Sequence, residues 1–243
     1  MSDAADIPTV LTAELEAGLN TLSTATLTYQ LQIRGIRSTF LSGLKPLHAD
    51  KRMVGRARTL RYVAVREDVQ REYAGGINAQ KRIVEATQPG DVLVIEARGS
   101  ADAATIGDIF ATRLFALGGR GIVTDGALRD TPAIAAIGHP VYHFASHGAT
   151  LGRAHMPFST DEPITCADVF VVPGDVVVGD GEGVVVIPAA LVAEVTRDAL
   201  IQEEKENFAL ERVAAGESTI GLFPLSEERL PDFKAWQAAK ADK

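Results

Sequence analysis

Three short runs of β-branched residues follow one another between residues 168 and 188, and only turn sequences separate them. The runs are DVFVV, DVVVGD and GVVVIP, a composition that is typical of buried strands. Strands joined by tight turns pair as antiparallel neighbours, because parallel strands need a long crossover between them. These runs therefore favour a mixed or antiparallel α/β core over a regular parallel sheet.

The turns of this chain repeat one signature. Pro89-Gly90-Asp91 and Pro173-Gly174-Asp175 each precede a run of strand-forming residues. Proline and glycine suit the two central positions of a type II turn, and the aspartate then begins the strand. A second turn signal, Asp125-Gly126, is expected to end the strand that begins at Gly121.

Helices and strands are expected to alternate irregularly along a single domain that spans residues 1–243. It would comprise N-terminal helices at about 9–35, a core at about 50–188 and a helical C-terminal region at about 189–243. No low-complexity linker interrupts the sequence. Apolar spacing and breaker residues predict helices at 9–20, 23–35, 76–88, 103–117, 189–214 and within 226–240, and strands at 53–65, 92–97 and 140–145.

Charge and composition limit the partners of the protein. The 32 acidic residues outnumber the 24 basic ones, and a net charge of −8 argues against broad nucleic-acid binding. The single cysteine, Cys166, excludes a disulfide within the chain and suits a reducing cytosol. The acidic start of the chain, broken by Pro8, does not resemble a secretory signal, and no apolar run reaches the roughly 20 residues that span a bilayer. We expect a cytoplasmic protein without nucleic-acid or membrane partners.

An arginine and an aspartate stand side by side just beyond the strand that begins at Gly121, at Arg129-Asp130. Upstream, Gly107-Asp108 lies near the beginning of the expected helix, where unpaired backbone N–H groups attract anions. A strand that returns beside this helix would bring both pairs to one place. We therefore expect helix-end amides, a guanidinium and one or two carboxylates to converge there.

Such a convergence would suit four complementary tasks. The helix-end amides would hold a carboxylate, and Asp130 would hold a hard divalent cation. Arg129 would face an oxygen that becomes negative during a reaction, and Asp108 would order or deprotonate a water. The alternative interpretation is a capped helix beside a surface Arg–Asp pair, with no chemistry.

Two stretches carry a resemblance to a known family. They are Gly107-Asp108 followed by Arg129-Asp130, with twenty residues between Asp108 and Arg129, and PGDVVVGDGEGVVVIP at 173–188. Through them, about residues 20–215 resemble the regulator-of-ribonuclease-activity-A family. That family includes divalent-metal 4-hydroxy-4-methyl-2-oxoglutarate and 4-carboxy-4-hydroxy-2-oxoadipate aldolases. The resemblance implies a swivelling β/β/α-type α/β fold with a long C-terminal helix, assembled as a homotrimer or a dimer of trimers with active sites between subunits.

The resemblance also implies roles for individual residues. Asp130 matches the metal-binding aspartate, and Arg129 matches the arginine that stabilises a pyruvate enolate. Asp108 matches the aspartate that positions the water for proton transfer. The backbone that binds the pyruvyl carboxylate matches the segment with Gly107, Ile109 and Phe110.

In the aldolases a C-terminal glutamate from a neighbouring subunit completes the site by holding metal-bound water. The segment QEEKENF offers Glu203, Glu204 and Glu206, of which Glu203 or Glu206 is favoured. One departure from the pattern concerns Ala133, which stands three positions after Asp130 where the aldolases have an acidic residue. A carboxylate that supports the metal is therefore expected to be missing.

The function that the resemblance implies is a lyase that depends on Mg²⁺ or Mn²⁺. It would cleave 4-hydroxy-2-oxo acids or decarboxylate oxaloacetate through a pyruvate enolate, so its ligand would be a small 2-oxo acid. Two alternatives stay open, because a shared fold does not establish an activity. One is a non-catalytic regulator that binds a ribonuclease or another protein. The other is a dehydratase-type enzyme that acts on a 2-oxo acid derived from a sugar acid.

Histidines recur every four residues in HPVYHFASH, at His139, His143 and His147. Residues four apart share a face of a strand, so His143 or His147 could reach the site, although a packed or solvated histidine is the commoner role. Cys166 has no partner in the sequence that marks it as a nucleophile, and it is expected to be a small buried residue.

Overall fold

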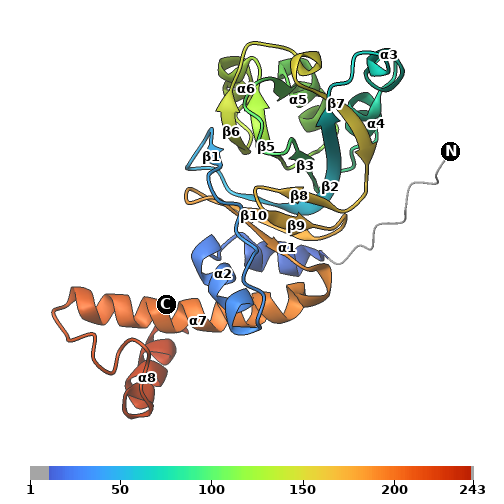
Figure 1. Cartoon of the computed structure of the whole chain (residues 1–243). Helices are drawn as coiled ribbons and strands as arrows, with labels where there is room; N and C mark the ends of the chain where they lie inside the picture. Colours follow the sequence, from blue (N-terminus) through green and yellow to red (C-terminus); the bar gives the residue numbers. More distant parts are fainter. Residues whose placement is uncertain (1–10, 242–243) are drawn as a thin grey trace.

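The computed structural model describes residues 11–241, whose labelled elements are shown in Figure 1. The acidic segment before residue 11, and with it the start of the helix expected at 9–20, lies outside the described residues. Helix α1 spans Ala13–Leu19, and α2 spans Thr24–Ile33. The predicted start of α2 is confirmed, because Ser23 Oγ caps it by accepting a hydrogen bond from Thr26 N at 3.1 Å.

A nine-stranded mixed sheet forms the core, so the predicted mixed α/β class is confirmed. Its centre, β6-β5-β3-β2, is parallel, and β1, β7, β10 and β11 pair antiparallel with their neighbours. Strand β4 pairs in parallel with β5. The bounds are β1 Lys45–Pro46, β2 Met53–Ala64, β3 Asp91–Glu96, β4 Ala104–Ile106, β5 Gly121–Leu128, β6 Val141–Ser146, β7 His155–Thr160, β10 Val176–Gly179 and β11 Val184–Ile187.

The three β-branched runs near residues 168–188 do form strands, but they do not all join one sheet. β10 and β11 make a hairpin in the large sheet, whereas β9 (Val169–Val171) pairs with β8 (Ile164–Cys166) in a separate two-stranded sheet. This small sheet packs on the buried face of the large one, where Val169 and Val171 join the same apolar cluster as Val92 and Val177. The valines of β9 are therefore buried between the two sheets.

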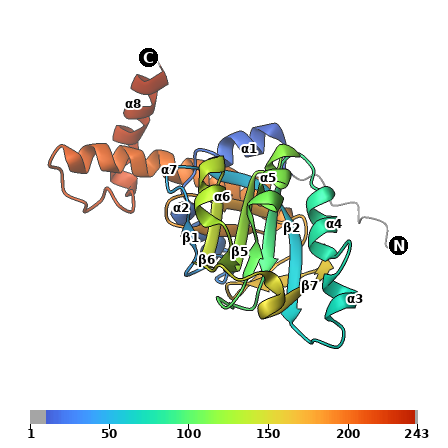
Figure 2. The same ribbon diagram turned by 90° about the horizontal axis from the view of Figure 1, so that it is seen from above.

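Helices cover the sheet in two groups, which Figure 2 shows from above. The first group packs on the parallel strands and consists of α4 (Ala79–Glu85), α5 (Asp108–Ala116) and α6 (Thr131–Ile137). The second packs on β10 and β11 and consists of α1, α2 and the first half of α7 (Val192–Ala214). The short helix α3 (Gln70–Ala74) lies against β7. No helix in the range 11–241 is long and apolar enough to cross a membrane.

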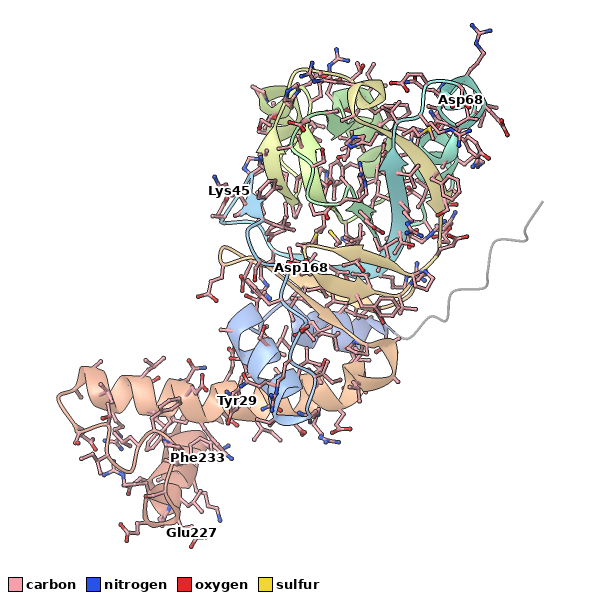
Figure 3. All side chains as sticks on the ribbon, in the orientation of Figure 1. Tyr29, Lys45, Asp68, Asp168, Glu227 and Phe233 are labelled. Atoms are coloured by element: carbon pink, nitrogen blue, oxygen red, sulfur yellow. The ribbon has the colours of Figure 1, made fainter. Side chains whose placement is uncertain are left out.

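The second half of α7 and helix α8 (Leu230–Ala241) form an arm that projects from the body. The arm has a small apolar core of its own, in which Phe208 of α7 packs edge-on against Phe233 and Trp236 of α8. Phe233 is labelled in Figure 3, beside the long helix. The long C-terminal helix that was expected at 189–214 is thus confirmed, with a short 3-10 turn over its first residues.

The turn predicted at Asp125-Gly126 is wrong, because β5 runs through it to Leu128. The strand register shifts between Thr124 and Ala127, as in a β-bulge. The Asp125 carboxylate is turned inward and accepts hydrogen bonds from the backbone N–H groups of Ala97 and Gly99. A Cβ on Gly126 would lie 2.6 Å from that of Ala97. The aspartate and the glycine therefore allow β5 to lie close to the segment that contains Ala97 and Gly99, and they do not end the strand.

Asp125→Ala is expected to lower the free energy of unfolding by about 2 kcal/mol, because it leaves the buried N–H group of Ala97 without an acceptor. Urea denaturation followed by circular dichroism measures the change. Asp102→Ala is the matched control, since Asp102 is exposed in the loop before β4 and its loss should change stability by less than about 0.5 kcal/mol. Equal stabilities for the two variants would contradict the role given to Asp125.

Candidate active site

The segment before α5 differs from the prediction. A helix was expected at 103–117, but Ala104–Ile106 form strand β4 and α5 begins only at Asp108. The β-branched Thr105 and Ile106 are buried beside β5, and this pairing replaces their helical conformation. Gly107 is the N-cap of α5, so the helix start lies at the Gly107–Phe110 segment of the family pattern.

The N-terminus of α5 presents backbone N–H groups to a cavity. The hydrogen bond from Ala111 N to Gly107 O at 3.1 Å is the first of the helix, so the amides before it have no carbonyl partner within α5. One of them, Ile109 N, donates to Asp108 Oδ1 at 2.8 Å. A carboxylate oxygen is therefore already accommodated at this helix end, where the helix dipole favours negative charge.

Strand β5 returns beside the start of α5, as predicted, and delivers Arg129 and Asp130 there. Arg129 N donates to Ile106 O at 3.0 Å, which ties the end of β5 to the end of β4. Asp130 adopts a left-handed conformation with φ of 56°, which is uncommon for a residue other than glycine. A Cβ on Gly107 would lie only 3.1 Å from Asp130 Oδ2. The absence of a side chain at Gly107 thus leaves room for this carboxylate.

The two charged side chains are close to each other and open to solvent. Arg129 Nε lies 3.4 Å from Asp130 Oδ2, and the side chains are 45% and 36% exposed. An ion pair with this exposure adds little to stability. The Asp130 side chain also makes no capping hydrogen bond to α6. The pair is therefore poorly explained as a stabilising feature and remains accessible to a ligand.

A cavity of about 310 Å³ joins these groups. It is lined by β4, the first turn of α5, Arg129 and Asp130, together with Gln80 of α4 and the segment Thr150–Leu151. An open groove on the other side of Arg129 and Asp130 is lined by Ser146 and His147. The Arg–Asp pair therefore stands between two hollows, within reach of ligands on either side.

The donor set at Asp130 fits a hard divalent cation. Asp130 and Asp108 supply carboxylate oxygens at the same cavity. Mg²⁺ is commonly held by one or two carboxylates while it keeps several waters, so a preformed cage of protein ligands is not needed. Within residues 11–241 no group of three histidine, cysteine or acidic side chains is placed to hold a metal ion. A cation at Asp130 would therefore need water or groups from outside this chain to complete its coordination.

The glutamates expected from the C-terminal region lie elsewhere in the same chain. They are on α7, which in Figure 1 lies across the sheet from α5 and α6. Glu203 Oε1 accepts a hydrogen bond from Ser23 N at 2.7 Å, and Glu206 Oε1 accepts one from Gln202 Nε2 at 2.7 Å. One chain alone does not bring either glutamate to Asp130, so their role as metal residues stays a prediction about a neighbouring subunit.

The other residues noted in the sequence lie around the site in different ways. Ala133 is exposed on the first turn of α6, so that position supplies no carboxylate to Asp130. His143 is buried with Nδ1 3.1 Å from the carbonyl oxygen of Lys45, and burial lowers its pKa. His147 lines the open groove, where its Nδ1 accepts a hydrogen bond from Ala149 N. Of the two histidines, His147 is therefore the one beside Arg129.

Cys166 is buried, as predicted, and burial raises the pKa of its thiol well above the ordinary value. Gln80 was not singled out by the sequence, yet it reaches the cavity with only 2% of its surface exposed. No motif marks a glutamine on a short amphipathic helix. The only available signal was its place among the buried positions of α4.

Several known proteins are similar to this chain. It is 36% identical over 149 residues to a protein of Halalkalibacterium halodurans that carries the provisional name 4-hydroxy-4-methyl-2-oxoglutarate aldolase; the match covers 60% of this chain and 65% of that protein. A protein of Ectopseudomonas mendocina with the same provisional name is 33% identical over 119 residues, which are 46% of this chain and 68% of that protein. The chain thus covers slightly less than two thirds of the first relative.

A solved structure matches the chain over most of its length. It is RraAS2 of Streptomyces coelicolor, described as an unusual member of the RNase ES inhibitor RraA protein family. The two are 35% identical with a TM-score of 0.77, and the match covers 83% of this chain and 98% of that one. Residues 19–186 also match the family described as RraA-like, Aldolase/RraA. The chain therefore belongs to the RraA-like family.

Proposed function

We propose that the protein is a metal-dependent lyase that cleaves a 4-hydroxy-2-oxo acid, or decarboxylates oxaloacetate, through a pyruvate enolate. The observation that carries the proposal is the meeting of Arg129, Asp130 and the free helix start of α5 around one cavity. The provisional aldolase names of two relatives agree with it. We further propose that a neighbouring subunit of a homotrimer or a dimer of trimers contributes Glu203 or Glu206.

Each group of the chain has a task in this reaction. The amides at Ile109 and Phe110 would bind the substrate carboxylate, for which the Asp108 side chain would have to leave Ile109 N. A Mg²⁺ or Mn²⁺ ion held by Asp130 would supply Lewis-acid polarisation of the 2-keto group. Arg129 would face the oxygen that becomes negative as the bond between C3 and C4 breaks and its electron pair enters the enolate.

Proton transfer would complete the reaction. In the aldol cleavage the 4-hydroxyl group would pass its proton, through an ordered water, to the released Asp108 carboxylate and become the carbonyl of the departing product. A water ordered by the released Asp108 carboxylate would then give a proton to C3 and so yield pyruvate. Decarboxylation of oxaloacetate ends in the same protonation, because both reactions pass through the same enolate.

The first test is exchange of the methyl protons of pyruvate in D₂O, followed by NMR with Mg²⁺ or Mn²⁺ present. Exchange that requires the metal is expected, because it is the reverse of the final protonation. A screen of 4-hydroxy-2-oxo acids, oxaloacetate and sugar-acid derivatives, coupled to pyruvate detection, would then identify the substrate. Absence of both exchange and metal binding would exclude an enolate enzyme.

A non-catalytic regulator is the second candidate function, since the Streptomyces coelicolor relative is described as a member of an RNase inhibitor family. The two proposals differ in what they require of the cavity. A regulator needs no metal at Asp130, and its binding to a ribonuclease should survive Asp130→Asn. Inhibition of a ribonuclease by a variant that has lost methyl-proton exchange would establish regulation as a separate activity.

Gly107→Ala tests the close approach of Asp130 to the backbone. The added methyl group would lie 3.1 Å from Asp130 Oδ2, so the carboxylate would have to shift slightly, whereas the φ of −117° suits alanine. We expect Mg²⁺ to bind more weakly by no more than about tenfold, because the end of an exposed side chain can shift by a small amount at less than the roughly 1 to 3 kcal/mol that crowding a packed core costs. Calorimetric titration measures the affinity. Gly148→Ala places a methyl group in the groove on the other side of Asp130, where it meets no atom, and this comparison variant should bind as the unmodified protein does.

A further inference from the structure

We propose that Gln80 is a positioning residue of the candidate active site and acts through strand β4 on both Gly107 and Arg129. Its catalytic consequence rests on the proposed function, whereas its structural consequence can be measured without substrate or metal. The proposal begins from the unusual position of β4. This strand is buried along its whole length, but β5 is its only strand neighbour within the described residues. Its remaining carbonyl groups need other partners, because a buried C=O is rarely left unpaired.

Side chains take the place of the missing neighbour strand. Thr105 O accepts two hydrogen bonds of 2.6 Å, one from Gln80 Nε2 of α4 and one from Tyr62 Oη of β2. His155 Nε2 of β7 lies 3.2 Å from Ala104 O. A carbonyl oxygen can only accept, so this contact requires a proton on Nε2, and burial lowers the pKa of the ring. Three elements thus converge on two successive carbonyl groups of β4.

The position of β4 sets the geometry of the catalytic groups on both sides of the cavity. Ile106 O accepts the backbone N–H of Arg129 at 3.0 Å, so β4 holds the point where the guanidinium side chain begins. Gly107 follows Ile106 directly and is the N-cap of α5. A shift of Thr105 therefore moves the substrate-binding amides and Arg129 together.

Gln80 differs from the other two donors because it also lines the cavity. Tyr62 and His155 are fully buried behind β4, where their rings pack edge to face. Gln80 lines the cavity with only 2% of its surface exposed, and its amide Nε2 donates to Thr105 O. This places a fixed, uncharged amide between the protein interior and the ligand space.

The main experiment compares Gln80→Glu with the unmodified protein over a range of pH. An ionised carboxylate has no proton to donate and would repel Thr105 O, whereas a protonated carboxyl can donate as the amide does. Burial raises the pKa of a carboxyl, so part of this titration falls in an accessible range. The measured quantity is the rate at which the enzyme exchanges the methyl protons of pyruvate. We expect the rate of the variant, divided by that of the unmodified protein at the same pH, to rise as pH falls. A ratio that does not change with pH would overturn the proposal.

A second measurement needs no turnover. Hydrogen–deuterium exchange of the metal-free protein should show faster exchange of the hydrogen-bonded backbone amides of Ala104, Ala111 and Arg129 in Gln80→Leu, with the amides of α7 unchanged. Gln32→Leu, an exposed position on α2, is the control and should leave both sets of amides unchanged. Tyr62→Phe removes the other donor to Thr105 O, so the double variant should lose more protection than the two single losses predict. Unchanged protection of the amides of Ala104, Ala111 and Arg129 in Gln80→Leu would refute the positioning role.

The measurements separate this inference from the proposed function. If the unmodified protein does not exchange the protons of pyruvate, the proposed function fails, and the amide-exchange result still decides whether Gln80 holds β4. If the unmodified protein is active, Gln80→Leu should lower the rate of pyruvate methyl-proton exchange about tenfold to a hundredfold, because displaced catalytic groups lose rate to this extent. Should Gln80→Leu not fold, the pH series with Gln80→Glu decides. Full activity together with full protection would overturn the proposal.

Discussion

Asp130→Asn is expected to slow the metal-dependent exchange of pyruvate protons by at least about a hundredfold, because Lewis-acid stabilisation is worth several kcal/mol. The substitution keeps the shape of the side chain but removes the negative charge that would hold the cation. Stability should change little, since the carboxylate is 36% exposed and makes no capping hydrogen bond to α6. NMR measures the exchange, and calorimetric titration measures the binding of Mg²⁺.

Asp102→Asn provides the matched control for Asp130. This exposed aspartate precedes β4 in sequence and does not line the cavity. It should retain the exchange rate and the Mg²⁺ affinity of the unmodified protein. If Asp130→Asn kept both properties as well, the cation site would have to be sought elsewhere in the chain or in its assembly.

Arg129→Met should lower the exchange rate on the order of a hundredfold to a thousandfold, the usual cost of removing one donor that faces a developing oxyanion. Arg129→Lys should give an intermediate loss, because it keeps the charge but not the planar fork of donors. The 3.4 Å contact with Asp130 is largely solvated, so unfolding should be little affected. Steady-state exchange kinetics with increasing pyruvate would show a loss in kcat rather than only in KM.

Arg113→Met serves as the control for Arg129. Arg113 lies on the same helix α5 and pairs with Glu85 at 2.8 Å on the exposed surface. Its loss should leave the exchange rate within about twofold of the unmodified value, as expected for an exposed ion pair worth less than about 1 kcal/mol. Similar losses in both arginine variants would mean that positive charge near α5, and not the position of Arg129, determines the rate.

Local signals predicted the two Pro-Gly turns and the start of α2. Gly90 and Gly174 have positive φ angles of 91° and 95°, as the repeated Pro-Gly turn requires. Ser23 caps α2 at the predicted residue. These features depend on one residue and its immediate neighbours, so a short stretch of sequence contains the information that specifies them.

Predictions failed where a distant segment changed the environment. Thr105 and Ile106 leave the expected helix because β5 offers a pairing partner. Asp125 and Gly126 continue a strand because the backbone N–H groups of Ala97 and Gly99 supply donors to the buried Asp125 carboxylate. The strand Val169–Val171 was expected from its valines. Its pairing with β8 in a separate sheet was not, because that pairing depends on the apolar face of the large sheet against which the valines pack. Local preference is small beside such tertiary contacts.

The sequence by itself determined the mixed α/β class, the Pro-Gly turns and the chemistry available at Asp108, Arg129 and Asp130, because composition and local spacing are enough to specify these. Only the tertiary structure decided that β4 precedes α5, that Gly107 leaves space for Asp130 and that Gln80 holds Thr105. Each of these depends on atoms far apart in the chain. Their distances result from packing around the whole sheet, which no short stretch of sequence specifies.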